Sequence, residues 1–109
     1  MNEFMALKRS EKQLAVEKII NMTLGGSIYW EKENGIIQAD YESRLRNHIE
    51  IETFTEKNVR GITMTKITIT NENGKLVLHN GDITADTHRR LLNSINLQIK
   101  ESNVLLDFI

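Results

Sequence analysis

The sequence predicts an α+β domain in which an N-terminal helix, an antiparallel meander of about five strands and a C-terminal helix follow one another. Two Asn-Gly dipeptides, Asn34-Gly35 and Asn73-Gly74, lie between segments rich in β-branched and aromatic residues. Asn followed by Gly best tolerates the positive φ angles of a two-residue hairpin turn. Segments with helical spacing flank this region on both sides. We therefore expect the C-terminal helix to pack on one sheet face, alone or with the first helix, and the other face to be wet.

Composition limits the class of protein. The 109 residues suffice for a single α+β domain over 1–109. Fourteen Lys and Arg against fifteen Asp and Glu give a net charge of −1, so a charged partner would have to recognise a local patch. The absence of cysteine excludes disulfides and thiol nucleophiles and fits a reducing compartment. No segment approaches the ~20 apolar residues of a membrane span. These features predict a cytoplasmic protein without membrane contact.

The first helix is expected over 11–24. Ser10 and Gln13 have the Ser-x-x-Gln spacing of a capping box, which marks a helix start. An extension back to residue 4 is the alternative, and the glycine pair at 25–26 ends the helix. The apolar positions spread wider than one stripe, which indicates cover on both sides or a partner subunit on one of them.

The first Asn-Gly turn sets a hairpin register that can be checked against itself. A two-residue loop at 34–35 pairs Glu33 with Ile36 and, further out, Trp30 with Ala39. Both strands then agree on which side is apolar, and a one-residue slip would destroy that agreement. The predicted inner face carries Ile28, Trp30, Ile37, Ala39 and Tyr41.

Two further strands are expected over 47–55 and 60–70. A tight turn between them would place Ile51 beside Met64. The apolar residues of the second strand change phase near its middle, and a β-bulge at 65–66 is the simplest explanation. The threonines of this strand are interpreted as a sign of β-propensity alone.

The second Asn-Gly turn predicts that Ile69 pairs with Leu78. The inner face of this second hairpin would then carry Ile67, Ile69, Leu76 and Leu78.

The last helix should begin at Thr84, a favoured N-cap residue, with Asp86 in its first turn. Spacings of three and four residues define a buried stripe of Leu91, Leu92, Ile95 and Ile99. Apolar residues on the other side and in the tail exceed what one sheet face needs, which indicates an interface. The alternative is a tail that folds back over the open end of the sheet. The predicted interface residues are Leu97, Val104, Leu105, Phe108 and Ile109.

Basic residues near the start of this helix suggest an anion site. His88, Arg89 and Arg90 add positive charge to a helix N-terminus, which favours a phosphate or a partner's carboxylate. Local salt bridges with Asp82 and Asp86 are the alternative interpretation.

A second basic patch could form from Arg44, Arg46 and Arg60 near two loops of the sheet. Together with Arg89 and Arg90, these residues make nucleic-acid binding an alternative function. The chain contains no clear helix-turn-helix and no aromatic-rich RNA-binding motif, and acidic residues are mixed throughout.

One strand face carries His48, Glu50 and Glu52, which are residue types that ligate metals. Threonines are expected opposite both glutamates, so a solvated strand face is favoured over a metal site. The sequence shows no phosphate-binding glycine loop and no nucleophile with an activating base. It therefore nominates no catalytic residue, no metal ligand set and no cofactor.

The favoured function is a non-catalytic binding or regulatory protein that acts through protein–protein contact, as a homodimer. The alternatives are a nucleic-acid-binding protein and a protein that binds or sequesters a small anion such as a phosphate or nucleotide. The usage of Asn, Lys and Ile is typical of AT-rich genomes and their phages, which suggests a phage or mobile element as the source.

Overall fold

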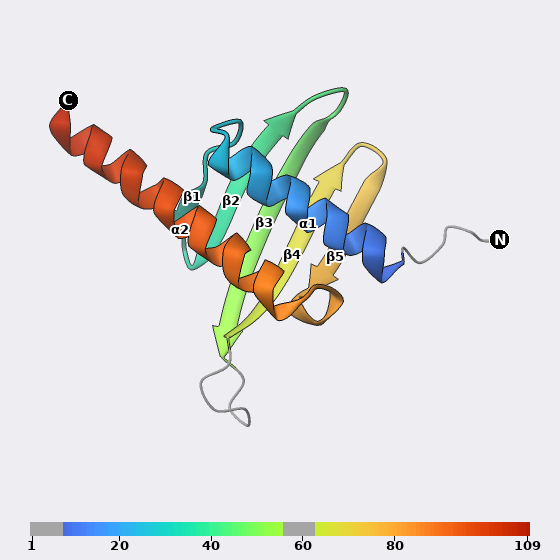
Figure 1. Cartoon of the computed structure of the whole chain (residues 1–109). Coiled ribbons are helices and arrows are strands. Elements are labelled where there is room, and N and C mark those ends of the chain that lie inside the picture. Colours follow the sequence, from blue (N-terminus) through green and yellow to red (C-terminus); the bar gives the residue numbers. More distant parts are fainter. Residues whose placement is uncertain (1–7, 56–62) are drawn as a thin grey trace.

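The computed structural model describes residues 8–55 and 63–109 and confirms the predicted α+β architecture (Figure 1). A helix precedes a five-stranded antiparallel sheet in the order β1-β2-β3-β4-β5, and a longer helix follows it. The elements are α1 (Arg9–Leu24), β1 (Glu31–Glu33), β2 (Ile36–Glu42), β3 (Arg46–Thr55), β4 (Thr63–Asn71), β5 (Gly74–His79), the 3₁₀ helix η1 (Asn80–Asp82) and α2 (Ala85–Phe108).

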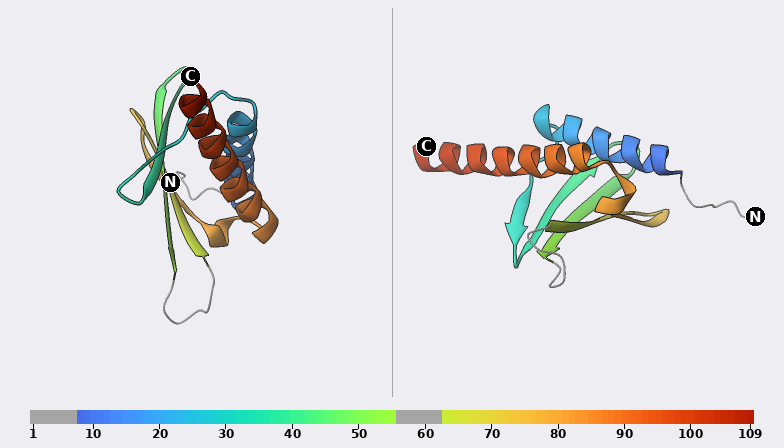
Figure 2. Two further views of the ribbon diagram at one scale, coloured as in Figure 1. Left: turned by 90° about the vertical axis from the view of Figure 1, so that its left-hand side faces the viewer. Right: turned by 60° about the horizontal axis from the view of Figure 1, so that its bottom comes forward.

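Both helices cover the same face of the sheet and leave the other face open (Figure 2). They run in the same direction along that face. Lys12 near the start of α1 contacts Asp82, and Glu17 one turn further on contacts Arg90 of α2. The chain thus forms two layers, and the core lies between them.

The core contains most of the residues that the sequence placed on the inner face. Tyr41, Ile69 and Leu76 are partly buried and pack against it. The predicted core residues that are fully enclosed include Ile28, Trp30, Ile37, Ala39, Ile67, Leu78, Leu91 and Ile95.

The capping box predicted for α1 is wrong. Lys8 is the N-cap, and its backbone N–H donates to the Glu11 carboxylate at 3.0 Å. Ser10 lies inside the helix, while the Gln13 side-chain oxygen accepts a hydrogen bond from the backbone N–H of Thr84 at 3.1 Å. The Gln13 side chain therefore bonds to Thr84, a residue distant in sequence, and does not cap its own helix as the local spacing predicted. The alternative start at residue 4 lies outside the described residues.

The first hairpin has the predicted turn and register. Asn34 and Gly35 have φ angles of 53° and 80°, and Glu33 pairs with Ile36. Asn34 is the only described residue other than glycine with a positive φ. The dipeptide therefore supplies the left-handed backbone that a type I′ turn needs.

Replacing Gly35 by alanine is expected to destabilise the chain by about 1–2 kcal/mol, because a Cβ atom is strained at this positive φ. Gly81→Ala is the matched control: a Cβ there meets no atom within 4 Å and its φ lies outside the left-handed region. Urea denaturation followed by circular dichroism measures both. Equal losses in the two variants would show that the turn does not require its glycine.

The segment before β1 leaves the sheet earlier than predicted. Ile28 and Trp30 are buried as expected, but the ladder between β1 and β2 stops short of the predicted pairs with Tyr41 and Ala39. The backbone N–H of Trp30 donates instead to the Gln98 side chain of α2 at 2.8 Å. This bond ties the segment before β1 to α2.

The turn between β4 and β5 lies one residue earlier in the chain than predicted. Asn71 pairs with Gly74, and the two residues between them occupy the turn. The Asn71 side chain accepts a bond from the backbone N–H of the turn's third residue at 2.8 Å. Asn at the first and Gly at the fourth position are typical of a type I turn. Ile69 therefore pairs with Leu76 and not with Leu78, although the inner face is unchanged.

The predicted pairing of β3 with β4 and the bulge at 65–66 are also wrong. Ile51 pairs with Ile67, and the ladder is continuous along the described part of both strands. Met64 pairs with Phe54 on the outer face. An apolar pair on the wet side produced the apparent phase change, because the pattern assumed that every apolar residue faces inward.

The inner-face position at the supposed bulge is occupied by Thr65, which is 1% exposed. Its hydroxyl oxygen lies 2.6 Å from the His88 Nε2 of α2. Thr65 therefore has a specific role in joining sheet to helix, beyond the β-propensity assigned to it. The register also places Thr68 and Lys66 opposite Glu50 and Glu52, in place of the threonines expected at 65 and 63.

Candidate interaction surface

α2 begins as predicted and is well packed over its first half. The Thr84 hydroxyl accepts the N–H of Thr87 at 3.1 Å and caps the helix. Leu91 and Ile95 are fully buried, while Leu92 and Ile99 are half-buried. The buried side also includes three polar residues that the apolar pattern could not indicate, Thr87, Ser94 and Gln98.

The second half of α2 extends beyond the rest of the fold (Figures 1 and 2). α1 ends at Leu24, which borders the same hollow as Leu97 of α2. From there α2 continues as a helix to Phe108, so the tail does not fold back over the sheet. Its apolar side chains are largely exposed: Leu97 50%, Val104 61%, Leu105 58%, Leu106 68%, Phe108 86% and Ile109 85%.

These apolar residues follow a helix–helix contact pattern. Arg90, Ser94 and Leu97 lie on the side of α2 that meets α1. Intervals of three and four residues carry the same line onward through Glu101, Val104 and Phe108. The line is thus covered by a helix in its first half and bare in its second. Six side chains border one shallow depression along it, which we call the α2 stripe: Leu97, Lys100, Glu101, Val104, Leu105 and Phe108.

A hollow of about 240 Å³ lies between α1 and α2 next to the stripe. Ile20 and Leu24 of α1 and Leu97 of α2 supply its apolar lining, and Asn93 supplies part of its polar lining. Sequence reasoning missed Leu24 as part of this surface. The excess apolar width of the first helix was the available signal, but only the fold places that residue beside Leu97.

The three residues of the predicted anion site point in different directions. His88 turns inward to Thr65, and burial lowers the pKa of its imidazole. Arg89 donates to Asp86 at 2.5 Å. Arg90 binds Glu17 of α1 as well as Asp86, and its guanidinium lowers the pKa of the Glu17 carboxyl. Of the two local partners that the alternative interpretation named, Asp86 binds both arginines, whereas Asp82 pairs with Lys12 of α1. Anion binding stays a prediction.

The two described residues of the second basic patch lie elsewhere. Arg44 is in the loop before β3 and Arg46 begins that strand, and both are exposed. α2 starts at the opposite end of the sheet, where β3 finishes (Figure 1). The structure therefore does not bring Arg44 and Arg46 together with the arginines of α2. Arg60 lies outside the described residues.

The open sheet face carries a histidine between two carboxylates. His48 Nδ1 lies 2.9 Å from an Asp40 oxygen, and Nε2 lies 3.0 Å from a Glu50 oxygen. The Asp40 carboxylate, and after it that of Glu50, raise the pKa of His48 above its usual 6.5. Because both ring nitrogens face carboxylates, the imidazole is not directed at a hydroxyl that it could activate.

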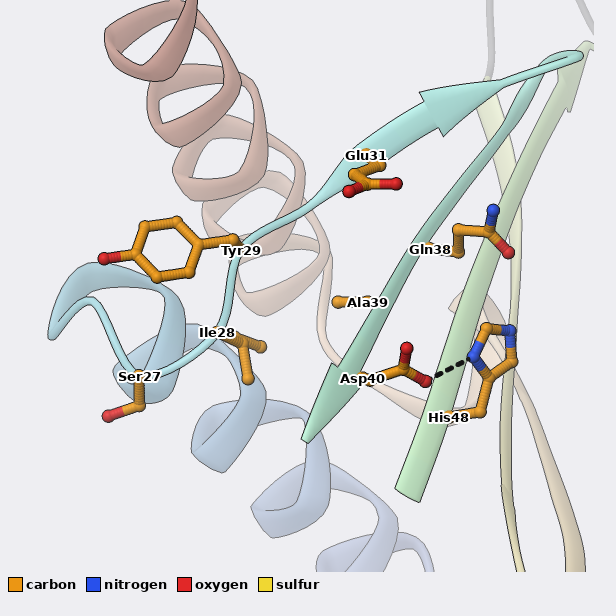
Figure 3. A pocket seen from close by; sticks show the side chains of 8 residues that line it. All are labelled: Ser27, Ile28, Tyr29, Glu31, Gln38, Ala39, Asp40 and His48. Atoms are coloured by element: carbon orange, nitrogen blue, oxygen red, sulfur yellow. Dashed lines mark hydrogen bonds and ion pairs between the residues drawn. The ribbon is translucent and has the colours of Figure 1, made fainter. Parts of the chain in front are cut away.

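A polar pocket of about 340 Å³ lies beside this histidine (Figure 3). Tyr29 and Glu31 border it on one side, and Gln38 and Asp40 of β2 on the other. It opens where the segment before β1 diverges from β2. Among residues 8–55 and 63–109, no group of three or more acidic or histidine side chains is arranged to hold a metal ion.

Of the three histidines, His48 and His88 are expected to have pKa values on opposite sides of the usual 6.5. His48 is raised, so it stabilises the fold below about pH 6.5, and that contribution is lost as the pH rises through its folded-state value. His88 is lowered, so its contribution is present above about pH 6.5 and falls away as the pH drops. An NMR titration of the imidazole protons measures both midpoints, with His48→Gln and His88→Gln to assign them. Coincident midpoints would contradict this arrangement.

No helix in the described part of the chain combines the length and apolar character needed to cross a bilayer. The chain matches no family model, no curated protein and no solved structure.

Proposed function

We propose that this chain is a cytoplasmic, non-catalytic binding protein that acts through protein–protein contact, as a homodimer joined through the second half of α2. The observation that carries the proposal is the α2 stripe, an apolar helix surface that begins where α1 ends. Contiguous exposed apolar surface of this kind is typical of protein interfaces. A closed two-fold dimer covers such a surface on both copies at once.

The remaining surface suits a regulatory protein that occupies a partner. A dimer joined through α2 leaves the polar sheet face around His48 free on each copy. The nucleic-acid alternative has less support, because Arg44 and Arg46 lie at the opposite end of the sheet from the start of α2 and because Arg89 and Arg90 are engaged by Asp86 and Glu17.

Truncation after Asn103 tests the proposal. Sedimentation velocity should show a dimer for the full chain and a monomer for the truncated chain. Thermal unfolding of the two should be similar at low concentration, because residues 104–109 are exposed and contribute nothing to the core. A truncated chain that remains dimeric would remove residues 104–109 from the interface.

A pair of point variants controls for the loss of apolar surface in general. Val104→Asp should give a monomer, whereas Leu14→Asp, at a residue of α1 that is 67% exposed, should leave the dimer intact. Equal effects of both substitutions would contradict a specific contact through α2.

A further inference from the structure

We propose that the open edge of β2 binds an extended, basic segment of a protein partner as an added antiparallel strand. The proposal rests on the part of the proposed function in which the chain occupies a protein partner, and it is independent of how two copies of the chain associate. Residues 39–42 form this edge, which we call the β2 edge.

The β2 edge has a neighbouring strand on one side only. The ladder between β1 and β2 ends at Gln38, whereas the ladder between β2 and β3 continues to Glu42. Figure 3 shows the chain that carries Tyr29 apart from Asp40, at the point where β1 would otherwise continue. The polar pocket of about 340 Å³ lies between them, so the place of the missing neighbour is open.

The backbone groups of the edge point in directions that the surrounding bonds fix. The Tyr41 carbonyl accepts a bond from the Asn47 side chain of β3 and therefore faces that strand. Because the direction alternates along an antiparallel strand, the N–H and C=O groups of Asp40 and Glu42 face away from β3. Within the described part of the chain no bond to these four groups is found. An added strand would satisfy all of them.

Charge identifies the class of ligand. The outward positions of β1 and β2 carry four carboxylates and no basic side chain: Glu31, Glu33, Ile36, Gln38, Asp40 and Glu42. Asp40 contacts His48 through one carboxylate oxygen, and its side chain remains 73% exposed. An added strand places one residue directly opposite Asp40 and another opposite Glu42. Opposite charges across a ladder stabilise the pair, so both residues should be Lys or Arg.

The residue between these two basic residues would lie opposite Tyr41 on the inner side of the sheet. The Tyr41 side chain is partly buried and packs against the core. This position therefore favours an apolar side chain. The ligand that fits the edge is an extended segment in which one apolar residue separates two basic ones.

The same charges disfavour a second copy of the β2 edge as the occupant. Two-fold antiparallel pairing sets the outward-bonding residues of one copy against those of the other. The possible pairs are Asp40 with Asp40, Asp40 with Glu42, and Glu42 with Glu42. Each register puts carboxylates directly opposite one another, which is destabilising.

Amide hydrogen exchange measured by NMR tests the proposal at the backbone groups concerned. The probe is the acetylated and amidated peptide Thr-Lys-Ile-Lys-Thr. At roughly ten times its dissociation constant it should slow exchange of the Asp40 and Glu42 amides about tenfold. The Tyr41 amide, which faces β3, should not change. No slowing up to the solubility limit of the peptide would overturn the proposal.

Two control peptides separate strand addition from attraction between charges. Methylation of the backbone nitrogen of both lysines keeps the charge but removes the donors to β2, so this peptide should not slow exchange. Replacement of both lysines by glutamate should have the same result. Equal slowing by the methylated peptide would overturn the added strand.

A matched pair of variants tests the position of the charge. Glu42→Lys should weaken binding of the fluorescently labelled peptide about tenfold. Glu72→Lys makes the same charge change at an exposed residue in the turn between β4 and β5, and it should leave binding unchanged. Equal weakening by both, measured by fluorescence anisotropy, would attribute binding to net charge and overturn the proposal.

The outcome for the β2 edge is distinguishable from the outcome for the dimer. A chain that dimerises through α2 but binds no peptide would overturn this inference and leave the proposed dimer standing. A monomeric chain whose Asp40 amide is protected by the peptide would support the inference and overturn the dimer. Slower exchange of that amide on raising the protein concentration alone would show that a second copy occupies the edge, which would contradict the basic ligand.

Discussion

Trp30→Ala is expected to lower the free energy of unfolding by about 3–5 kcal/mol, the usual cost of deleting a large buried aromatic side chain. Trp30 is 4% exposed, and it joins the sheet to both helices. Its indole N–H donates to the Thr23 hydroxyl of α1 at 2.9 Å, and its backbone N–H donates to Gln98 of α2. Urea denaturation followed by circular dichroism measures the loss, since the variant lacks the only tryptophan.

Trp30→Phe separates the two contributions of this side chain. Phenylalanine keeps much of the apolar volume but removes the donor to Thr23, so we expect a smaller loss of about 1–3 kcal/mol. Alanine and phenylalanine variants of equal stability would show that packing around the indole contributes little. That result would contradict the inward orientation of Trp30, on which the assignment of the inner and outer sheet faces depends.

The same substitution in the two halves of α2 is expected to have opposite consequences. Leu91→Ala should destabilise the chain by about 2–5 kcal/mol, because Leu91 is fully buried and its removal leaves a cavity. Leu97→Ala should change stability by less than about 0.5 kcal/mol at low protein concentration, yet weaken the dimer. Chemical denaturation and sedimentation equilibrium on both variants measure the two quantities.

The contrast between these leucines is informative because their chemistry is identical. If Leu91→Ala weakened the dimer at concentrations where the variant is folded, and Leu97→Ala left the dimer unchanged, the interface would lie on the first half of α2. That result would contradict the proposal. Equal destabilisation by both would mean that the core reaches further along α2 than the burial of its side chains indicates.

The sequence was enough to predict the parts of the fold where a residue type strongly favours one local conformation. Asn34-Gly35 supplies two positive φ angles, and Thr84 supplies a side-chain acceptor at a helix start. Alternating apolar residues then assigned the inner face correctly, including Trp30. These features depend on neighbours within a few residues, so the sequence displays them directly.

The errors arose where a side chain bonds to a distant partner or where an apolar residue faces water. Gln13 belongs to the α1–α2 contact and not to a cap. Met64 and Phe54 face each other on the open side of the sheet, which shifted the predicted register. The Asn71 side chain accepts a hydrogen bond within the second turn, which therefore begins at Asn71, one residue earlier than the Asn-Gly dipeptide predicted. None of these partners is visible from spacing alone.

The candidate surface was predictable in composition but not in arrangement. The excess of apolar residues after Leu97 indicated an interface. The sequence could not reveal that α1 ends beside that residue, because the meeting of Leu24 with Leu97 depends on how two helices far apart in the chain are aligned on the sheet.

Hydrogen exchange along α2 tests most directly whether a second copy covers its tail. A helix segment without tertiary contacts is marginally stable, so its amides exchange quickly in the monomer. We predict that amides of residues 100–108 become markedly slower as protein concentration rises through the dimer dissociation constant, while those of residues 87–95 do not change. Tail amides that exchange at one rate at every concentration would contradict the account.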